Sequence, residues 1–86
     1  MIPTQRHLFD IPPEVAYLNC AYMSPLMHDV VAAGVDGLRR KSRPWTISSP
    51  DFFSGPEEGR SLFARIVGSD ADAVAVVPSA AYALAL

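Results

Sequence analysis

The sequence has a single cysteine, few aromatic residues and no surplus of positive charge. Its 86 residues include one Cys, 9% aromatic residues and a formal net charge of −2. One thiol cannot form an internal disulfide, which excludes a disulfide-stapled secreted scaffold. The negative net charge argues against a nucleic-acid partner, because nucleic-acid-binding proteins rely on a positive surplus. There is no apolar run of the roughly 18 residues that indicate a membrane span, and no signal peptide is visible, so we expect a cytoplasmic protein with no membrane partner.

Apolar residues are plentiful: 50% of the chain is hydrophobic and 19% is charged. This balance excludes a charge-driven disordered chain. A chain of this length nevertheless buries only a little over ~60% of its unfolded surface. Residues 80–86 are good helix formers without a glycine, a basic turn or a proline to end the helix. We therefore expect a single incomplete unit, cut off inside an element, whose stability depends on further chain or a partner.

Two segments carry the signals of helices that begin with a proline. Ser24 is a suitable N-cap and Pro25 fits the first helical position, with apolar residues at helical spacing from 26 to 38. Basic residues at 39–41 suit the end of that helix, and Pro44 ends it. The second helix is expected to start at Ser54 or Gly55, with Pro56 near the first position. It would bury an apolar stripe and end at Gly68; the stripe consists of Leu62, Phe63, Ile66 and Val67.

Two further segments favour strands. Residues 15–19 are short, apolar and partly β-favouring, whereas residues 73–77 form a continuous apolar run typical of a strand covered on both faces. Strands that alternate with helices indicate an α/β fold, in which this piece is mainly helical with short strands. A covered strand needs neighbours on both edges, and the chain offers none of similar character.

The turn between the second predicted strand and the last helix is the strongest candidate site. A helix start presents unpaired backbone N–H groups, and small residues let an anion approach them. Ser79, Ala80 and Ala81 have these properties, and the Ser79 hydroxyl adds another donor. The pattern therefore permits a phosphate site, although an ordinary N-cap serine explains the same residues.

Other reactive side chains are scattered. His7 and His28 lack the spacing of a metal site, so we predict no metal, and Cys20 is expected to be a small buried residue. The basic residues 39–43 are read as a solvated helix end rather than as a DNA-contacting helix.

Three segments, in order, resemble the N-terminal part of pyridoxal-phosphate (PLP)-dependent enzymes of the class V aminotransferase type, which include the cysteine desulfurases and the isopenicillin-N-epimerase-like group. They are residues 16–25 (AYLNCAYMSP), 61–68 (SLFARIVG) and 76–82 (VVPSAAY). The resemblance implies an α/β PLP-dependent transferase-like fold, a homodimer and a small amino-acid substrate. It also implies an N-terminal arm with a short strand at residues 1–23 and the start of the large PLP-binding domain at 24–86.

The resemblance assigns roles to two groups of residues. Ser79, Ala80 and Ala81 would hold the phosphate of the cofactor, although Ala80 lacks the hydroxyl that the family often has there. Asn19, Cys20 and Ala21 would line the substrate side of the pocket. The lysine that binds PLP covalently and the acidic partner of its pyridine nitrogen are both expected outside residues 1–86, so no catalytic residue is assigned and Lys41 is not given the role.

The resemblance does not specify the reaction, since desulfuration, transamination, epimerisation, racemisation and β-elimination share the scaffold. The alternative is a small helical protein-interaction module without enzymatic activity. Its contact surface would consist of Trp45, Phe52, Phe53, Leu84 and Leu86.

Overall fold

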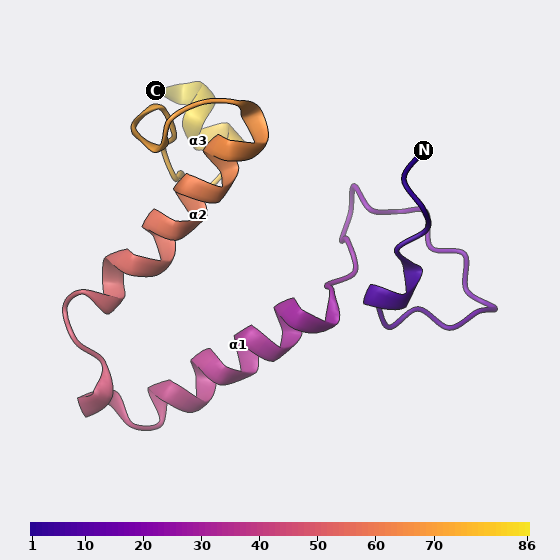
Figure 1. Ribbon diagram of the computed structural model, residues 1–86, viewed down its shortest axis with the longest axis horizontal. Coiled ribbons are helices and arrows are strands. Elements are labelled where there is room, and N and C mark those ends of the chain that lie inside the picture. Colours follow the sequence, from indigo (N-terminus) through magenta and orange to yellow (C-terminus); the bar gives the residue numbers. More distant parts are fainter. The chain divides into compact units, whose positions relative to one another are not determined.

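The computed structural model describes all 86 residues, which form two units, residues 1–46 and 47–86. Each unit is described by itself. The first contains η1 (Arg6–Leu8), α1 (His28–Lys41) and η2 (Pro44–Thr46), where η denotes a short 3₁₀ helix. The second contains α2 (Asp51–Val67), η3 (Ala71–Ala73) and α3 (Ala80–Ala85), as Figure 1 shows along the colour gradient.

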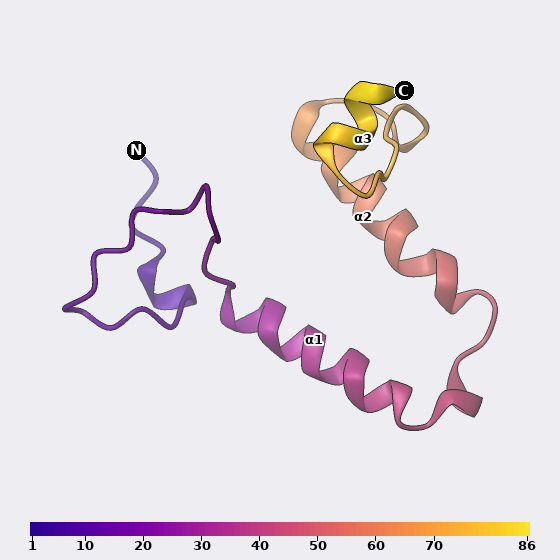
Figure 2. The same ribbon diagram turned by 180° about the vertical axis from the view of Figure 1, so that it is seen from behind.

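The prediction of an α/β fold is wrong: the structure is helical and contains no strand. Neither view in Figures 1 and 2 shows a strand arrow. Residues 15–19 and 73–77, the predicted strands, have no partner strand, and Ala73 belongs to η3. The β-type pairing that forms is one isolated antiparallel bridge between Phe9 and Met27. A strand is stabilised by hydrogen bonds to a neighbour, so β-favouring side chains do not form one where no neighbouring edge exists.

In the first unit, α1 begins later than predicted. Met27 precedes it with extended backbone (φ −65°, ψ 152°), and no side chain caps the helix. Ser24 and Pro25 therefore lie outside the helix rather than at its start. The reason is the bridge to Phe9, which requires extended backbone at Met27 and so delays the first helical residue to His28. The predicted basic last turn is confirmed, with Arg39, Arg40 and Lys41 ending α1.

In the second unit, α2 begins earlier than predicted. The Asp51 carboxylate accepts hydrogen bonds from the Ser48 backbone N–H (2.7 Å) and hydroxyl (2.9 Å), which closes a turn directly before the helix. Ser54 and Gly55 are consequently helical residues, and Pro56 lies inside α2 instead of at its first position. The predicted end is confirmed: Gly68 adopts the left-handed conformation (φ 69°), and the amides of Gly68 and Ser69 both donate to the Ala64 carbonyl.

The apolar side chains have little cover. Ala64, at 2% exposure, is the one buried residue of the chain. The predicted buried stripe of α2 is wrong, because its four members are all about half exposed or more. Helices of this length gain most of their stability from packing of an apolar face, so the faces of α1 and α2 remain available for contact. No helix combines the length and the apolar composition needed to cross a bilayer.

Candidate functional site

The predicted phosphate turn lies at the start of α3. Ser79 has extended backbone (φ −163°, ψ 162°), and its hydroxyl oxygen accepts a hydrogen bond from the Tyr82 N–H at 3.1 Å. The prediction that Ser79 caps this helix is therefore confirmed. The first N–H groups of a helix have no partner within the helix.

Three donors remain available at this turn. The backbone N–H groups of Ala80 and Ala81 have no hydrogen-bond partner in the chain. Ser79 accepts one hydrogen bond, but accepting it leaves the hydroxyl proton free to donate. The three residues are small and exposed, so their own side chains do not block access to these donors. Because α3 has only six residues, individual hydrogen bonds rather than a long helix dipole would hold such an anion.

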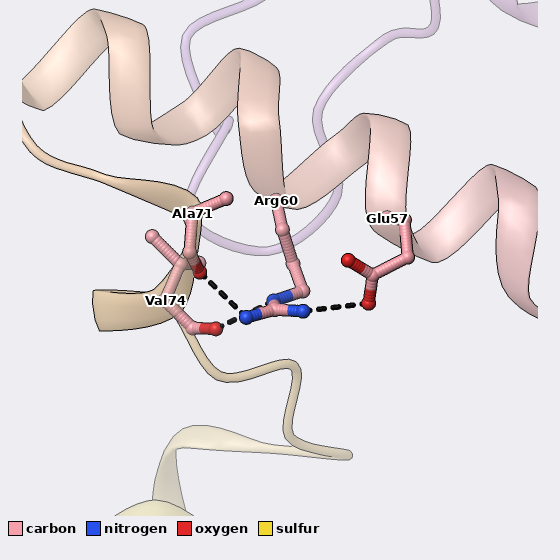
Figure 3. Close-up of polar contacts among 4 residues, drawn as sticks. All are labelled: Glu57, Arg60, Ala71 and Val74. Atoms are coloured by element: carbon pink, nitrogen blue, oxygen red, sulfur yellow. Dashed lines mark hydrogen bonds and ion pairs between the residues drawn. The ribbon is translucent and has the colours of Figure 1, made fainter.

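Arg60 in α2 ties down the segment that leads to this turn, as Figure 3 shows. Its Nε donates to the Val74 carbonyl at 2.8 Å, and its Nη2 donates to the Ala71 carbonyl at 2.6 Å. Its Nη1 forms an ion pair with Glu57 Oε1 at 2.6 Å, one turn earlier on α2. The Arg60 side chain is only 22% exposed, so these charge-assisted bonds are partly shielded from water.

Arg60 was not among the residues predicted to matter. The spacing of Glu57 and Arg60 indicates an ion pair on a helix surface. It does not reveal the two carbonyl contacts, because these depend on how the chain folds back after Gly68. One signal in the sequence could have drawn attention to Arg60. An arginine carries several N–H donors, so one placed on the helix before the turn can bind backbone carbonyls of the segment that follows.

A shallow apolar groove of about 330 Å³ lies between α2 and the extended segment. Its walls come from Gly59 and Phe63 on one side and from residues 74–77 on the other, with Arg60 contributing the one ionisable side chain. The groove therefore offers apolar contact and no acid, base or nucleophile.

The predicted substrate residues lie in the first unit, in a turn fixed by their own backbone. The Asn19 carbonyl accepts hydrogen bonds from the N–H groups of Tyr22 (3.2 Å) and Met23 (3.4 Å). The Tyr17 hydroxyl donates its one proton to the Met23 carbonyl (2.6 Å) and shares it with the Asn19 carbonyl, which lies farther away (3.2 Å). Cys20 is exposed, so the prediction of a buried thiol is wrong; no core forms around this turn. Asn19, Cys20 and Ala21 belong to a different unit from Ser79–Ala81, and a pocket shared by the two groups stays a prediction.

The remaining candidate ligands are dispersed. No group of three or more His, Cys, Asp or Glu side chains is placed to hold a metal ion. His7 lies in η1 and His28 is the first residue of α1. Comparisons of the chain with protein-family models, with curated proteins and with solved structures give no match. The resemblance to class V aminotransferases therefore stays a hypothesis that depends on the three segments quoted above.

Proposed function

We propose that the chain contributes part of the cofactor-phosphate site of a PLP-dependent enzyme of the class V aminotransferase type, a cytoplasmic homodimer that acts on an amino-acid substrate. The chain is not catalytic by itself in this proposal, since neither the covalent lysine nor the acidic partner of the pyridine nitrogen is assigned within it. The resemblance of residues 16–25, 61–68 and 76–82 motivates the proposal.

The observation that carries the proposal is the set of free donors at Ser79, Ala80 and Ala81. Two backbone N–H groups without partners and one hydroxyl proton match the oxygen acceptors of a phosphate monoester. The side chains of Ala80 and Ala81 end at Cβ and leave space beside their own N–H groups. The size of these residues therefore supports the proposal as well as their hydrogen-bonding groups.

The role of these residues is binding and orientation. PLP, when bound, supplies the electron sink for the reaction. Ser79 would donate its hydroxyl proton to a phosphate oxygen while its oxygen keeps the Tyr82 amide capped. Ala80 and Ala81 would donate their amide protons to the same group, and a phosphate held at several points fixes the orientation of the ring attached to it.

Binding of pyridoxine 5′-phosphate to the purified protein tests this proposal. The compound has no aldehyde and cannot react with the Lys41 amine, and pyridoxine is the matched ligand without phosphate. We expect equilibrium dialysis to show at least roughly tenfold tighter binding of the phosphorylated ligand, since charge-assisted hydrogen bonds contribute about 1.5 kcal/mol or more each.

Variants assign the binding to the turn. Ser79→Ala should weaken binding of pyridoxine 5′-phosphate by roughly tenfold, because it removes a charged-group hydrogen bond, whereas Ser79→Thr keeps the hydroxyl and should bind as the unaltered protein does. Ser69→Ala is the control, because the Ser69 side chain has no hydrogen bond in the structure. Equal affinity for the two ligands, or equal loss in the Ser69 and Ser79 variants, would contradict the proposal.

A second candidate function is a helical protein-interaction module, which the exposed aromatic side chains favour. Trp45 is 79% exposed in the first unit, and Phe52 is 71% exposed in the second. Aromatic residues are enriched in protein–protein interfaces and costly to leave in water. Size-exclusion chromatography with light scattering distinguishes the two functions. The module predicts a discrete oligomer that dissociates on Trp45→Ser or Phe52→Ser and that binds no pyridoxine 5′-phosphate.

A further inference from the structure

We infer that α2 packs antiparallel against the α2 helix of a second copy of this chain, along an apolar seam that its own chain leaves uncovered. The inference goes beyond the cofactor site: it assigns the contact surface of a homodimer, and it holds whether or not the protein binds pyridoxine 5′-phosphate. It comes from the order of large, small and charged residues along α2.

The seam is an exposed face of α2. Residues at spacings of three and four share one face of a helix, and this spacing defines the seam. Its members are Phe52, Gly55, Gly59, Leu62 and Ile66. All of them are exposed, and the two aliphatic side chains are 48% (Leu62) and 81% (Ile66) exposed. Ala64, the buried residue of α2, lies on the opposite side of the helix, so the second unit does not cover the seam itself.

Large and small residues alternate along the seam so that it is complementary to itself. When two helices run antiparallel with Gly59 opposite the partner's Leu62, Gly55 lies opposite the partner's Ile66, and the symmetry repeats both contacts. Each large side chain then meets a glycine, which is the arrangement that lets two surfaces interdigitate. In the single chain, a Cβ at Gly55 or Gly59 would meet nothing within 4 Å. Packing within the chain therefore requires neither glycine, although glycine is unfavourable inside a helix.

The charges at one edge of the seam match in the same alignment. Glu58 and Arg65 border the seam on one side, and both are exposed. They lie about 10 Å apart along the axis of α2, which is too far for an ion pair within one chain. In the antiparallel alignment that sets Gly59 opposite the partner's Leu62, Glu58 lies beside the partner's Arg65, and Arg65 lies beside the partner's Glu58. One contact therefore contains two symmetric ion pairs.

The surroundings of the seam also fit a second helix. A shallow hollow of about 460 Å³, lined by Leu62, Arg65 and Ile66, lies along the charged edge and leaves space for side chains of the partner. The other edge is apolar, since Pro56 lies beside the partner's Phe63, which is 53% exposed in the single chain.

These patterns specify a second copy as the occupant. The sizes and the charges are both complementary to themselves under a two-fold axis, whereas an unrelated partner would need neither property. The contact is one helix of about 25 Å, so the interface is small and the dimer should have a dissociation constant in roughly the micromolar range.

Sedimentation velocity of the purified protein over about a hundredfold range of concentration measures the association. We expect a monomer–dimer equilibrium. Glu58→Arg and Arg65→Glu should each weaken it roughly tenfold or more, because each change turns both ion pairs into repulsions. Glu14→Arg makes the same change of charge at an exposed position of the first unit and should leave the association unchanged.

Recombining the charges tests the alignment. An equimolar mixture of the Glu58→Arg and Arg65→Glu chains restores opposite charges at both contacts and should associate about as tightly as the unaltered protein. A chain that carries both changes should associate with itself for the same reason. These two arms also decide the case in which a single charge change lowers the helicity of α2.

Gly59→Leu tests the packing. It fills the space opposite the partner's Leu62 and should weaken the association roughly tenfold or more, whereas replacing a glycine inside α2 should raise its helicity in circular dichroism. Gly37→Leu is the matched change in α1 and should raise helicity without changing the association.

The opposite results would overturn the inference. They are a monomer at every concentration, an association that survives the Glu58, Arg65 and Gly59 changes, or a mixture of the two charge variants that stays monomeric. Loss of association in Trp45→Ser, with the α2 variants unaffected, would place the contact in the first unit instead. No ligand is added in these measurements, so a failure of the proposed cofactor site and a failure of this inference are distinguished.

Discussion

In each of the two units an arginine holds a segment that lies between the long helices and the rest of the unit: Arg6 in the first and Arg60 in the second, with different geometry. In the first unit, Arg6 donates from the single nitrogen Nη2 to the carbonyls of Pro12 (2.5 Å) and Val15 (2.7 Å), and the contact is exposed. In the second unit, Arg60 donates from three nitrogens, is half-buried and has an acidic partner. Water competes less well for the second set of bonds, so the segment at 71–74 is held more firmly than the segment at 12–15.

Side chains are also more buried in the second unit than in the first. The first unit buries no residue; its partly covered side chains gather near the Phe9–Met27 bridge. The second unit buries Ala64 and half-buries Arg60, Ala71, Val74 and Val77, where η3 contacts α2. In a chain with neither a sheet nor a large core, the hydrogen bonds of one guanidinium group and a few apolar contacts can still fix an irregular segment. The candidate phosphate turn follows the segment that is fixed in this way.

The largest expected effect comes from the one buried position. Ala64→Asp places a carboxylate where only 2% of the residue is exposed, which should destabilise the second unit by about 3 kcal/mol. Ala33→Asp in α1 is the matched change at an exposed position and should cost less than about 1 kcal/mol. Hydrogen exchange of the α1 and α2 amides measures both. Equal loss of hydrogen-exchange protection in the two helices would contradict the claim that the second unit covers its side chains better than the first.

The two arginine ties come next. Arg60→Ala should reduce the protection of the Ala73 and Val74 amides by about 2 kcal/mol, since its bonds are charge-assisted and partly shielded. Arg6→Ala should change the protection of the Val15 amide by less than about 1 kcal/mol, because its bonds are exposed. A larger loss of protection in Arg6→Ala than in Arg60→Ala would contradict the claim that the second arginine holds its segment more firmly.

Two glycines should respond with opposite signs. Gly68 has a positive φ of 69°, so Gly68→Ala forces a left-handed alanine and should destabilise α2 by about 1 kcal/mol. Gly37 lies inside α1 with open space where a Cβ would stand, so Gly37→Ala should stabilise α1 by about 0.5–1 kcal/mol. Circular dichroism melting curves of the two variants give the signs. The same sign in both would contradict the placement of Gly37 inside α1 and of Gly68 at the end of α2.

The smallest effects concern the two ion pairs. Glu57→Gln removes the carboxylate that lies 2.6 Å from Arg60 and should cost about 0.5 kcal/mol after allowance for the exposure of Glu57. Asp36→Asn disrupts a 3.6 Å pair with Arg39 in which both side chains are more than three-quarters exposed, and the cost should be close to zero. Thermal melting at low and high salt checks this order, since only the Glu57 variant should differ measurably from the unaltered protein at high salt.

Local signals in the sequence predicted the ends of the helices better than their beginnings. Gly68 and the basic residues at 39–41 act within one turn of the helix that they end, so their meaning does not depend on distant contacts. Ser79 caps α3 for the same reason. The predicted starts, Ser24 for one helix and Ser54 or Gly55 for the other, were wrong because other bonds decide where the helices begin. These are the Phe9–Met27 bridge before α1 and the Ser48–Asp51 turn before α2.

Strand formation and the contacts of Arg60 both depend on distant parts of the chain, and residue preferences carry no information about these. The apolar run at 73–77 indicates a covered strand, yet a strand requires a second edge, and none is present in the structure. Arg60 donates to the carbonyls of Ala71 and Val74, which lie beyond its own helix, and its spacing to Glu57 predicts only the local one of its three contacts. The cap at Ser79 was predictable, whereas the contacts of Arg60 with the segment before it were not.

The most direct test is a titration of ¹⁵N-labelled protein with pyridoxine 5′-phosphate, followed at the backbone amides. The account predicts that the Ala80 and Ala81 signals shift downfield and saturate together, with smaller changes at Tyr82, whose N–H is already bonded to Ser79. Pyridoxine at the same concentrations should leave the Ala80 and Ala81 signals in place. Shifts confined to other residues, or no difference between the two ligands, would contradict a phosphate site at this turn.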